Sequence, residues 1–229
     1  MKPLLYKEFK LAMHPICYVF VFLFPLMLLI PSYPIAIGFI YVLTCYPILF
    51  LGANKGQQSN DLLYSTLLPV RKKDIVLARI ITVAIMQFVF IAMLCALYPL
   101  ARLINENLSN VPSGKGSSIP GLGLDAFVSV IGIALIGYTI ADLIYFPIYY
   151  RKGRSIVMST LLMILGFVLY IGIFTIALPL IPGMEWYRDG LSGNIGIQFI
   201  VLGVTLILYV GVHYLIYRIA SKLLEKVDF

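Results

Sequence analysis

The chain has 229 residues, of which 61% are hydrophobic and only 12% are charged, and its formal net charge is +7. Soluble domains carry about 25% charged residues. This composition therefore excludes an ordinary soluble enzyme or binding domain and indicates a protein of the lipid bilayer. In such a protein an excess of Lys and Arg serves membrane topology and contact with anionic lipids, so we do not expect a nucleic-acid partner.

The first 14 residues have the pattern of an amphipathic helix that lies in the membrane interface. Apolar side chains recur at helical spacing along one side: Leu5, Phe9, Ala12, Met13 and Ile16. Lys7, Lys10 and His14 fall on another side. A frayed, slightly basic N-terminus is the alternative.

Six apolar stretches are long enough to cross a bilayer, which takes about 17 to 25 residues of helix. They cover residues 15–31, 34–53, 79–100, 124–149, 156–179 and 195–218. The first two lie within one charge-free run, 15–53, and the prolines Pro31 and Pro34 supply the turn between them. A secretory signal in place of the first span is disfavoured, because it lacks a small-residue cleavage site. The sequence therefore predicts an all-α membrane protein with a single transmembrane domain over residues 1–229.

Lys and Arg are distributed unevenly between the two sides of these spans. If the N-terminus is cytoplasmic, 14 of the 17 basic residues are also cytoplasmic, and only Arg102, Lys115 and Arg188 lie outside. This asymmetry predicts that both termini are cytoplasmic. The segment 101–123, rich in Gly, Ser, Pro and Asn, is then an extracellular loop, and 54–78 is a cytoplasmic one.

Small residues within the spans are interpreted as packing residues. Cys17, Cys45 and Cys95 lie in apolar runs without a Cys-x-x-Cys pair, so neither a disulfide nor a metal site is expected. Six glycines allow close contact between helices: Gly132, Gly137, Gly166, Gly172, Gly203 and Gly211.

Catalytic and nucleotide-binding motifs are not expected. His213 is followed by Tyr-Leu-Ile-Tyr, where a zinc protease needs H-E-x-x-H, and it is interpreted as an interfacial packing residue. The segment "SGKGSS", 113–118, resembles a phosphate-binding loop, but Gly116 follows the Lys where a Walker loop needs Ser or Thr. We therefore expect no enzyme and no cofactor bound by this chain.

Asp142 is the single acidic residue within a predicted span, and the cost of a charge there makes it a functional candidate. It precedes Arg151 by nine residues, about 13 Å along a helix. Structural pairing with a cytoplasmic Arg or Lys is therefore one interpretation, and a role in transport or gating is the other. Pro147 removes a backbone hydrogen bond and can bend the same helix, so it is a second gating candidate.

The densest cluster of charge follows a short helical pattern. Residues 59–61 can cap a helix N-terminus, Leu63 and Leu67 share a face, and Pro69 disfavours helix immediately before it. A new helix then begins with the basic residues 71–73 and continues into the third span. This predicts a short helix at the cytoplasmic surface, suited to pressing on a soluble partner.

Residues 62–79, "LLYSTLLPVRKKDIVLAR", closely resemble the Leu-Pro-Val segment and its basic residues in ABC-2 type permeases, the membrane subunits of bacterial ABC exporters. Residues 146–155, "FPIYYRKGRS", are similar to that family's second landmark, a Pro with aromatics followed by basic residues and Gly. With six spans and an inside C-terminus, the resemblance covers the whole chain.

The resemblance implies that residues 61–68 form a coupling helix docked on a separately encoded ABC ATPase. The implied ATPase-coupling residues are Asp61, Leu62, Leu63, Tyr64, Leu67, Leu68, Pro69, Arg71 and Lys72. A second cytoplasmic contact would use Tyr150, Arg151, Lys152 and Arg154. Two permease chains, identical or different, and an ATPase dimer that binds ATP and Mg would form an exporter in the bacterial cell membrane. Short re-entrant helices between spans five and six are left open.

The cargo is inferred only as a class. Few charges line the spans, which favours an amphipathic or hydrophobic substrate, such as a peptide toxin or antimicrobial. Three other functions stay open: a secondary transporter or channel using Asp142, an intramembrane enzyme, and a non-transporting immunity or sensor protein.

Overall fold

The computed structural model describes residues 2–13, 15–29, 70–108, 127–151, 156–173 and 195–226. Its elements are α1 (Lys2–Lys7), the π-helix η1 (Glu8–Ala12), α2 (Pro15–Leu23), the 3-10 helix η2 (Phe24–Leu29), α5 (Lys72–Leu108), α6 (Phe127–Arg151), α7 (Ile156–Ile171) and α10 (Ile195–Glu225). The described chain is thus all-helical, as predicted. α5, α6 and α10 are each long and apolar enough to cross a membrane, whereas Cys17–Leu29 and Met158–Ile171 are shorter apolar helices.

Two of the long helices extend beyond the predicted spans. α5 begins at Lys72, directly after a bend at Val70, and continues through Pro99 to Leu108. Residues 101–108, predicted to belong to an extracellular loop, are therefore helical. α10 likewise continues past residue 218 to Glu225. The predicted span 34–53 lies outside the described residues.

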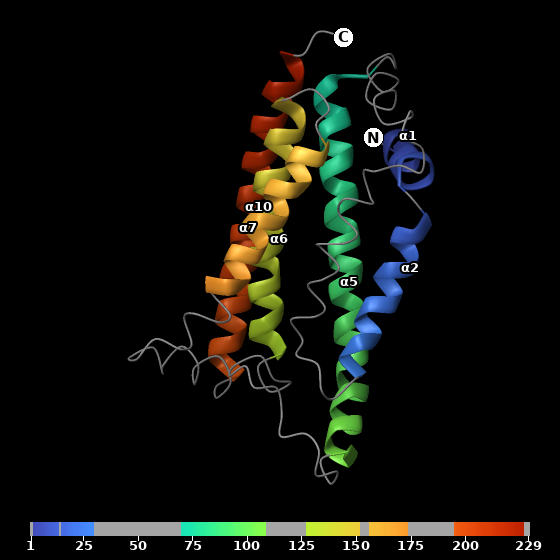
Figure 1. The fold of residues 1–229 in the computed structure, drawn as a ribbon, viewed down its shortest axis with the longest axis vertical. Coiled ribbons are helices and arrows are strands. Elements are labelled where there is room, and N and C mark those ends of the chain that lie inside the picture. Colours follow the sequence, from blue (N-terminus) through green and yellow to red (C-terminus); the bar gives the residue numbers. More distant parts are fainter. Residues whose placement is uncertain are drawn as a thin grey trace.

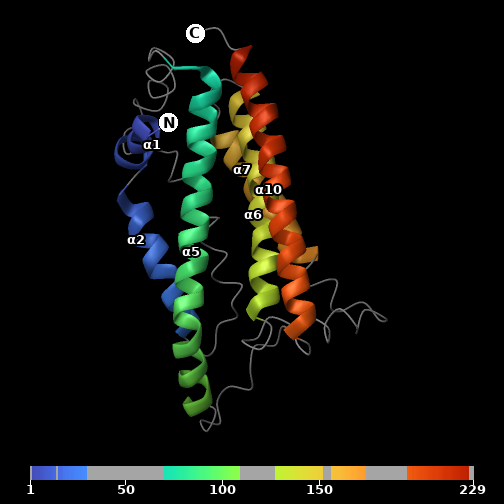
Figure 2. The same ribbon diagram turned by 180° about the vertical axis from the view of Figure 1, so that it is seen from behind.

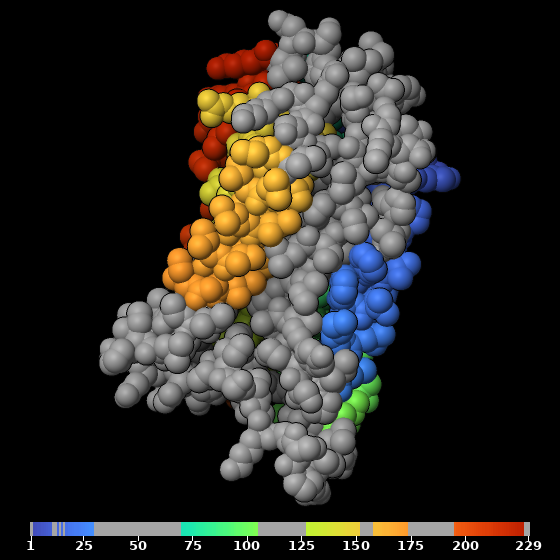
Figure 3. All heavy atoms as spheres, in the orientation of Figure 1, coloured from blue at the N-terminus to red at the C-terminus, as the bar shows by residue number. Residues whose placement is uncertain are grey.

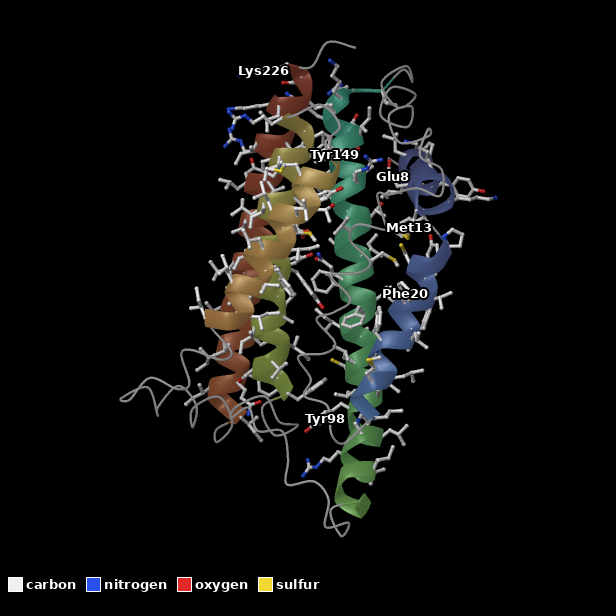
Figure 4. All side chains as sticks on the ribbon, viewed as in Figure 1. Glu8, Met13, Phe20, Tyr98, Tyr149 and Lys226 are labelled. Atoms are coloured by element: carbon white, nitrogen blue, oxygen red, sulfur yellow. The ribbon has the colours of Figure 1, made fainter. Side chains whose placement is uncertain are left out.

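Successive long helices run in opposite directions (Figures 1 and 2). The start of α5, the end of α6, the start of α7 and the end of α10 lie at the same end of the molecule as α1. Figure 4 shows Glu8, Tyr149 and Lys226 toward this end and Tyr98 toward the opposite end.

α6 is the central helix of the bundle. In its most apolar 18-residue segment 72% of the residues are buried, against 17% in the corresponding segment of α10. α6 packs mainly against α7 and α10. A Cβ atom at Gly137 would lie 2.8 Å from Cε2 of Phe167, and one at Gly132 would lie 3.2 Å from Oγ1 of Thr205. Gly166 is similarly tight against Ile144. The predicted close packing therefore holds at these three glycines. At Gly172, Gly203 and Gly211, by contrast, no described residue of a neighbouring helix lies within 4 Å of a Cβ atom.

The outer surfaces of α7 and α10 are apolar, as lipid contact requires. α7 exposes Leu161 and Leu165, and α10 exposes Ile207 and Val210. Figure 3 shows α7 on one side of the visible face and α2 on the other. Exposure of these apolar side chains along two helices is unfavourable in water and favourable in a bilayer.

The N-terminal segment differs from the predicted amphipathic helix. α1 passes into η1, and the helix ends at Met13, whose backbone is extended. Lys7, predicted on the polar side, is buried and lies 3.4 Å from Glu8 Oε1. Lys10 does remain exposed, and its Nζ donates to Tyr6 Oη at 2.6 Å. Lys7 therefore contributes to a buried ion pair and not to a polar outer face.

Candidate functional site

Four polar side chains meet in the interior where α5, α6 and α10 pack together. We call Gln87, Asp142, Tyr209 and His213 the mid-bundle cluster; their exposed fractions are 2%, 0%, 3% and 8%. Asp142 lies nine residues, or about 13 Å of helical rise, from the end of α6 at Arg151. That is almost half of a hydrocarbon core about 30 Å thick.

The mid-bundle cluster is a closed ring of hydrogen bonds. Tyr209 Oη donates to Gln87 Oε1 at 2.5 Å, and Gln87 Nε2 donates to Asp142 Oδ2 at 3.1 Å. The same carboxyl oxygen lies 2.8 Å from His213 Nε2, and His213 Nδ1 lies 2.7 Å from the Tyr209 carbonyl oxygen. The ring therefore ties three helices together in an interior where an unpaired polar group is costly.

Local helix geometry places the two α10 members side by side. Tyr209 and His213 are four residues apart, so they lie on one face, and their rings stack with centroids 3.9 Å apart. Phe88, next to Gln87 on α5, meets the Tyr209 ring edge-on at 5.4 Å. These ring contacts fix the orientation of the imidazole toward Asp142.

These contacts correct two interpretations drawn from the sequence. Asp142 pairs with His213 and Gln87 rather than with a cytoplasmic Arg or Lys. His213 is a buried hydrogen-bond partner rather than an interfacial packing residue. The sequence did hold a signal for this pairing. Asp142 is the acidic residue and His213 the histidine within the predicted spans, and polar groups at such positions pair with one another.

A second buried cluster lies nearer the end that holds α1. The Arg79 cluster consists of Glu8 from η1, Arg79 from α5 and Tyr149 from α6. Arg79 Nε and Nη2 donate to the two Glu8 carboxylate oxygens at 3.1 and 3.4 Å, and Nη1 donates to Tyr149 Oη at 3.2 Å. The Arg79 and Glu8 side chains are only 4% and 5% exposed. This pairing, which the sequence analysis missed, joins the N-terminal segment to two long helices.

The two clusters connect the antiparallel helices α5 and α6 at two levels. Arg79 and Gln87 are eight residues apart, about 12 Å along α5. Their α6 partners, Tyr149 and Asp142, are seven residues apart, about 10.5 Å in the opposite direction. An aromatic stack also joins these two helices, since the rings of Tyr98 on α5 and Phe127 on α6 lie with centroids 4.3 Å apart. α5 packs further against α1, η1, α2, η2 and α10. Polar and aromatic contacts together therefore join α5 to α6.

The predicted ATPase-coupling residues are only partly within the described chain. Arg71 is exposed and Lys72 is half-buried at the start of α5, whereas Asp61, Leu62, Leu63, Tyr64, Leu67, Leu68 and Pro69 lie outside the described residues. Next to them, Lys73 Nζ lies 3.2 Å from Glu225 Oε1 at an exposed site, which connects the start of α5 to the end of α10.

The second predicted contact is also divided. Arg151 is exposed, but Tyr150 is buried in the hydrophobic core, so it is a packing residue and not a surface contact. Lys152 and Arg154 lie outside the described residues. α6 continues through Pro147 to Arg151.

Within the described ranges, no three His, Cys, Asp or Glu side chains gather closely enough to hold a metal ion.

Residues 3–221 match the family described as ABC-2 family transporter protein, nearly the whole chain. The chain belongs to the ABC-2 transporter family. Comparison with curated proteins and with solved structures gave no match. Family membership, together with three membrane-spanning candidates, makes this ABC-2 protein an integral membrane permease subunit that works with an ABC ATPase.

Proposed function

We propose that this ABC-2 permease is the membrane half of a bacterial exporter with six spans per chain. Two permease chains and two ATPase subunits form the transporter in the cell membrane. The ATPases, and not this chain, bind ATP and Mg²⁺. The family match over residues 3–221 and the resemblance of segment 62–79 to the family's Leu-Pro-Val motif support this assignment.

The distribution of charge along the described helices supports cytoplasmic termini. Basic residues occur in α1 and η1 and toward the matching ends of the long helices: Lys2, Lys7, Lys10, Arg71, Lys72, Lys73, Arg79, Arg151, Arg218, Lys222 and Lys226. Arg102 alone among the described Lys and Arg lies near the other end of its helix. By the positive-inside rule, the end with the termini faces the cytoplasm.

Residues 61–68 act as the coupling helix, with Arg71 and Lys72 beside it. Arg151, Lys152 and Arg154 supply the lesser contact. The nearness of α5 in the sequence supports this role, since α5 begins four residues after Leu68. Movement of the coupling helix would act directly on α5, and the Arg79 cluster would pass it to η1 and α6. ATP-driven closure then favours one arrangement of the permease, because the docked contacts differ between the two states.

The cargo is amphipathic or hydrophobic, with a peptide toxin or antimicrobial as the leading class. The scarcity of charge in the described spans supports this choice, because a highly charged cargo would find few compensating groups. Asp142 and Pro147 take part in gating. The placement of Asp142 at the junction of three helices supports that role.

The assignment is tested by co-purification of the permease with its ABC ATPase. Leu63→Asp and Leu67→Asp place a charge on the proposed docking face and should abolish co-purification and ATP-driven export. Ser65→Asp adds the same charge to the opposite side of the segment and should retain both. Retention of the ATPase by the two leucine variants would overturn the coupling-helix assignment.

A second test separates this function from a secondary transporter or channel. Export by reconstituted vesicles should stop when the ATPase is replaced by a form that binds but does not hydrolyse ATP. Substrate movement that continues under an ion gradient alone would favour the alternative.

A further inference from the structure

Hydrogen-bond valence places a proton between Asp142 and His213. The Tyr209 carbonyl oxygen can only accept, so His213 Nδ1 carries a hydrogen and donates it at 2.7 Å. Nε2 lies 2.8 Å from Asp142 Oδ2. A bare Nε2 and a carboxylate oxygen are both acceptors, so this contact needs a proton on one of the two atoms. The pair is therefore an imidazolium with a carboxylate, or an imidazole with a carboxylic acid, and either form has no net charge.

Removing this proton would change the packing of the bundle. A proton transferred from the pair to water would leave a carboxylate facing the lone pair of Nε2, with a net negative charge in a buried site. Asp142 Oδ1 has no hydrogen-bond partner among the described residues, so that carboxylate would be stabilised through Oδ2 alone. Such a contact is unfavourable, and α6 and α10 would separate locally or admit water.

The titratable side chains around Asp142 and His213 do not take up the proton that the pair shares. Tyr138 is one turn from Asp142 on α6, and Tyr209 lies on α10. On α7, Tyr170 donates to the Ile133 carbonyl oxygen. Phenols keep their protons at neutral pH. Arg79, two turns along α5 from Gln87, is held by Glu8 and Tyr149. The other titratable thiols and phenols on the described helices are Cys17 and Tyr18 on α2, Cys95 and Tyr98 on α5, Tyr145 and Tyr150 on α6, and Tyr214 and Tyr217 on α10. The remaining charged residues lie toward the helix ends: Lys72, Lys73, Asp74, Arg102 and Glu106 on α5, Arg151 on α6, and Arg218, Lys222 and Glu225 on α10.

We propose that Asp142 and His213 form a proton-binding site whose single proton ties α6 to α10, and through Gln87 to α5. Bound proton favours the closed packing of the three helices, and its release favours their separation. The proton chemistry stands on the mid-bundle cluster alone. Only its use in the export cycle rests on the proposed function, where it makes a step of transport depend on pH.

The chain contains only two histidines, which allows a direct test. His14→Gln leaves His213 as the sole imidazole. The full chain with this substitution is labelled with ¹⁵N-histidine, placed in lipid nanodiscs and followed by nitrogen NMR from pH 5 to 9. We expect Nδ1 to stay protonated throughout, and Nε2 to change from proton-sharing to bare as the pH rises.

Two further substitutions in the His14→Gln background define the outcomes. Asp142→Asn should remove the proton-sharing state of Nε2, because the carboxyl group that shares the proton is gone. Tyr209→Phe breaks the bond to Gln87 but keeps the Asp142–His213 contact, so it should retain the transition. Circular dichroism and gel filtration show that each variant is folded. A bare Nε2 throughout, no transition up to pH 9, or the same behaviour in the Asp142→Asn variant would overturn the proposal.

The consequence for transport is measured separately, in vesicles that contain the permease and its ATPase. His14→Gln should keep the parent's dependence of export on pH, and Asp142→Asn should flatten it. Failure of the ATPase to assemble would contradict the proposed function but leave the NMR result unaffected. An unaltered pH profile in Asp142→Asn would overturn the role of the proton in transport.

Discussion

Replacing Arg79 by Met should destabilise the protein strongly, because the buried Glu8 carboxylate loses both hydrogen bonds from the guanidinium and retains the single 3.4 Å contact with Lys7. The pair makes two contacts of 3.1 and 3.4 Å, and its side chains are 4% and 5% exposed. Breaking a buried ion pair from one side costs about 3–5 kcal/mol. For a chain of this size, about 3 kcal/mol corresponds to a fall in Tm of about 6–12 °C. Thermal unfolding in detergent micelles, followed by circular dichroism, measures the shift.

A double-mutant cycle separates the pair from a general loss of packing. Glu8→Gln combined with Arg79→Met removes both charges, so the double variant should be more stable than the sum of the two single effects predicts. Lys73→Met is the matched control, since it makes the same kind of change on the same helix. Its pair with Glu225 is about half exposed and should contribute at most about 1 kcal/mol. An Arg79→Met variant that unfolds within about 2 °C of Lys73→Met would refute the reasoning.

Three further substitutions test the packing and the polar bridges by the same unfolding assay. Gly137→Ala places a methyl group 2.8 Å from a phenylalanine of α7 and should cost about 1–3 kcal/mol. Gly211→Ala meets no described residue of another helix within 4 Å, so it should be neutral or stabilising by up to about 1 kcal/mol. Equal effects of the two substitutions would contradict the packing described. Gln87→Leu removes the bridge from Tyr209 to the carboxyl group and should cost about 1–3 kcal/mol; no loss would mean that the bridge is not stabilising. Tyr149→Phe removes one hydrogen bond of Arg79 but keeps Glu8, so it should cost about 1–2 kcal/mol, and a loss as large as that of Arg79→Met would contradict this order.

The membrane helices could be located from sequence because lipid imposes a strict requirement on length and polarity. The apolar runs identified α6, which contains Asp142, and most of α10 directly. The helix ends were less accessible, since hydropathy follows the bilayer and not the helix. Residues 101–108 are polar enough to resemble a loop, yet Leu103 and Ile104 continue α5.

The two polar clusters could be predicted only in part. Asp142 stood out because ionisable groups are costly within a span, whereas His213 was interpreted as a packing residue. Their partnership depends on how α6 and α10 pack, and the two residues are separated by 71 positions. Glu8 and Arg79 are also 71 positions apart, and each looked like an ordinary charge near a membrane surface. Nothing in local spacing connects such pairs, because the contact arises from tertiary packing.

The coupling helix proposed for residues 61–68 is tested most directly by cross-linking in native membranes. A photoreactive amino acid at position 63 should form a covalent adduct with the ABC ATPase. The same amino acid at position 161, an exposed site on α7 that faces lipid in this account, should not. An adduct from position 161 alone, or labelling of position 63 from outside the cell, would contradict the account.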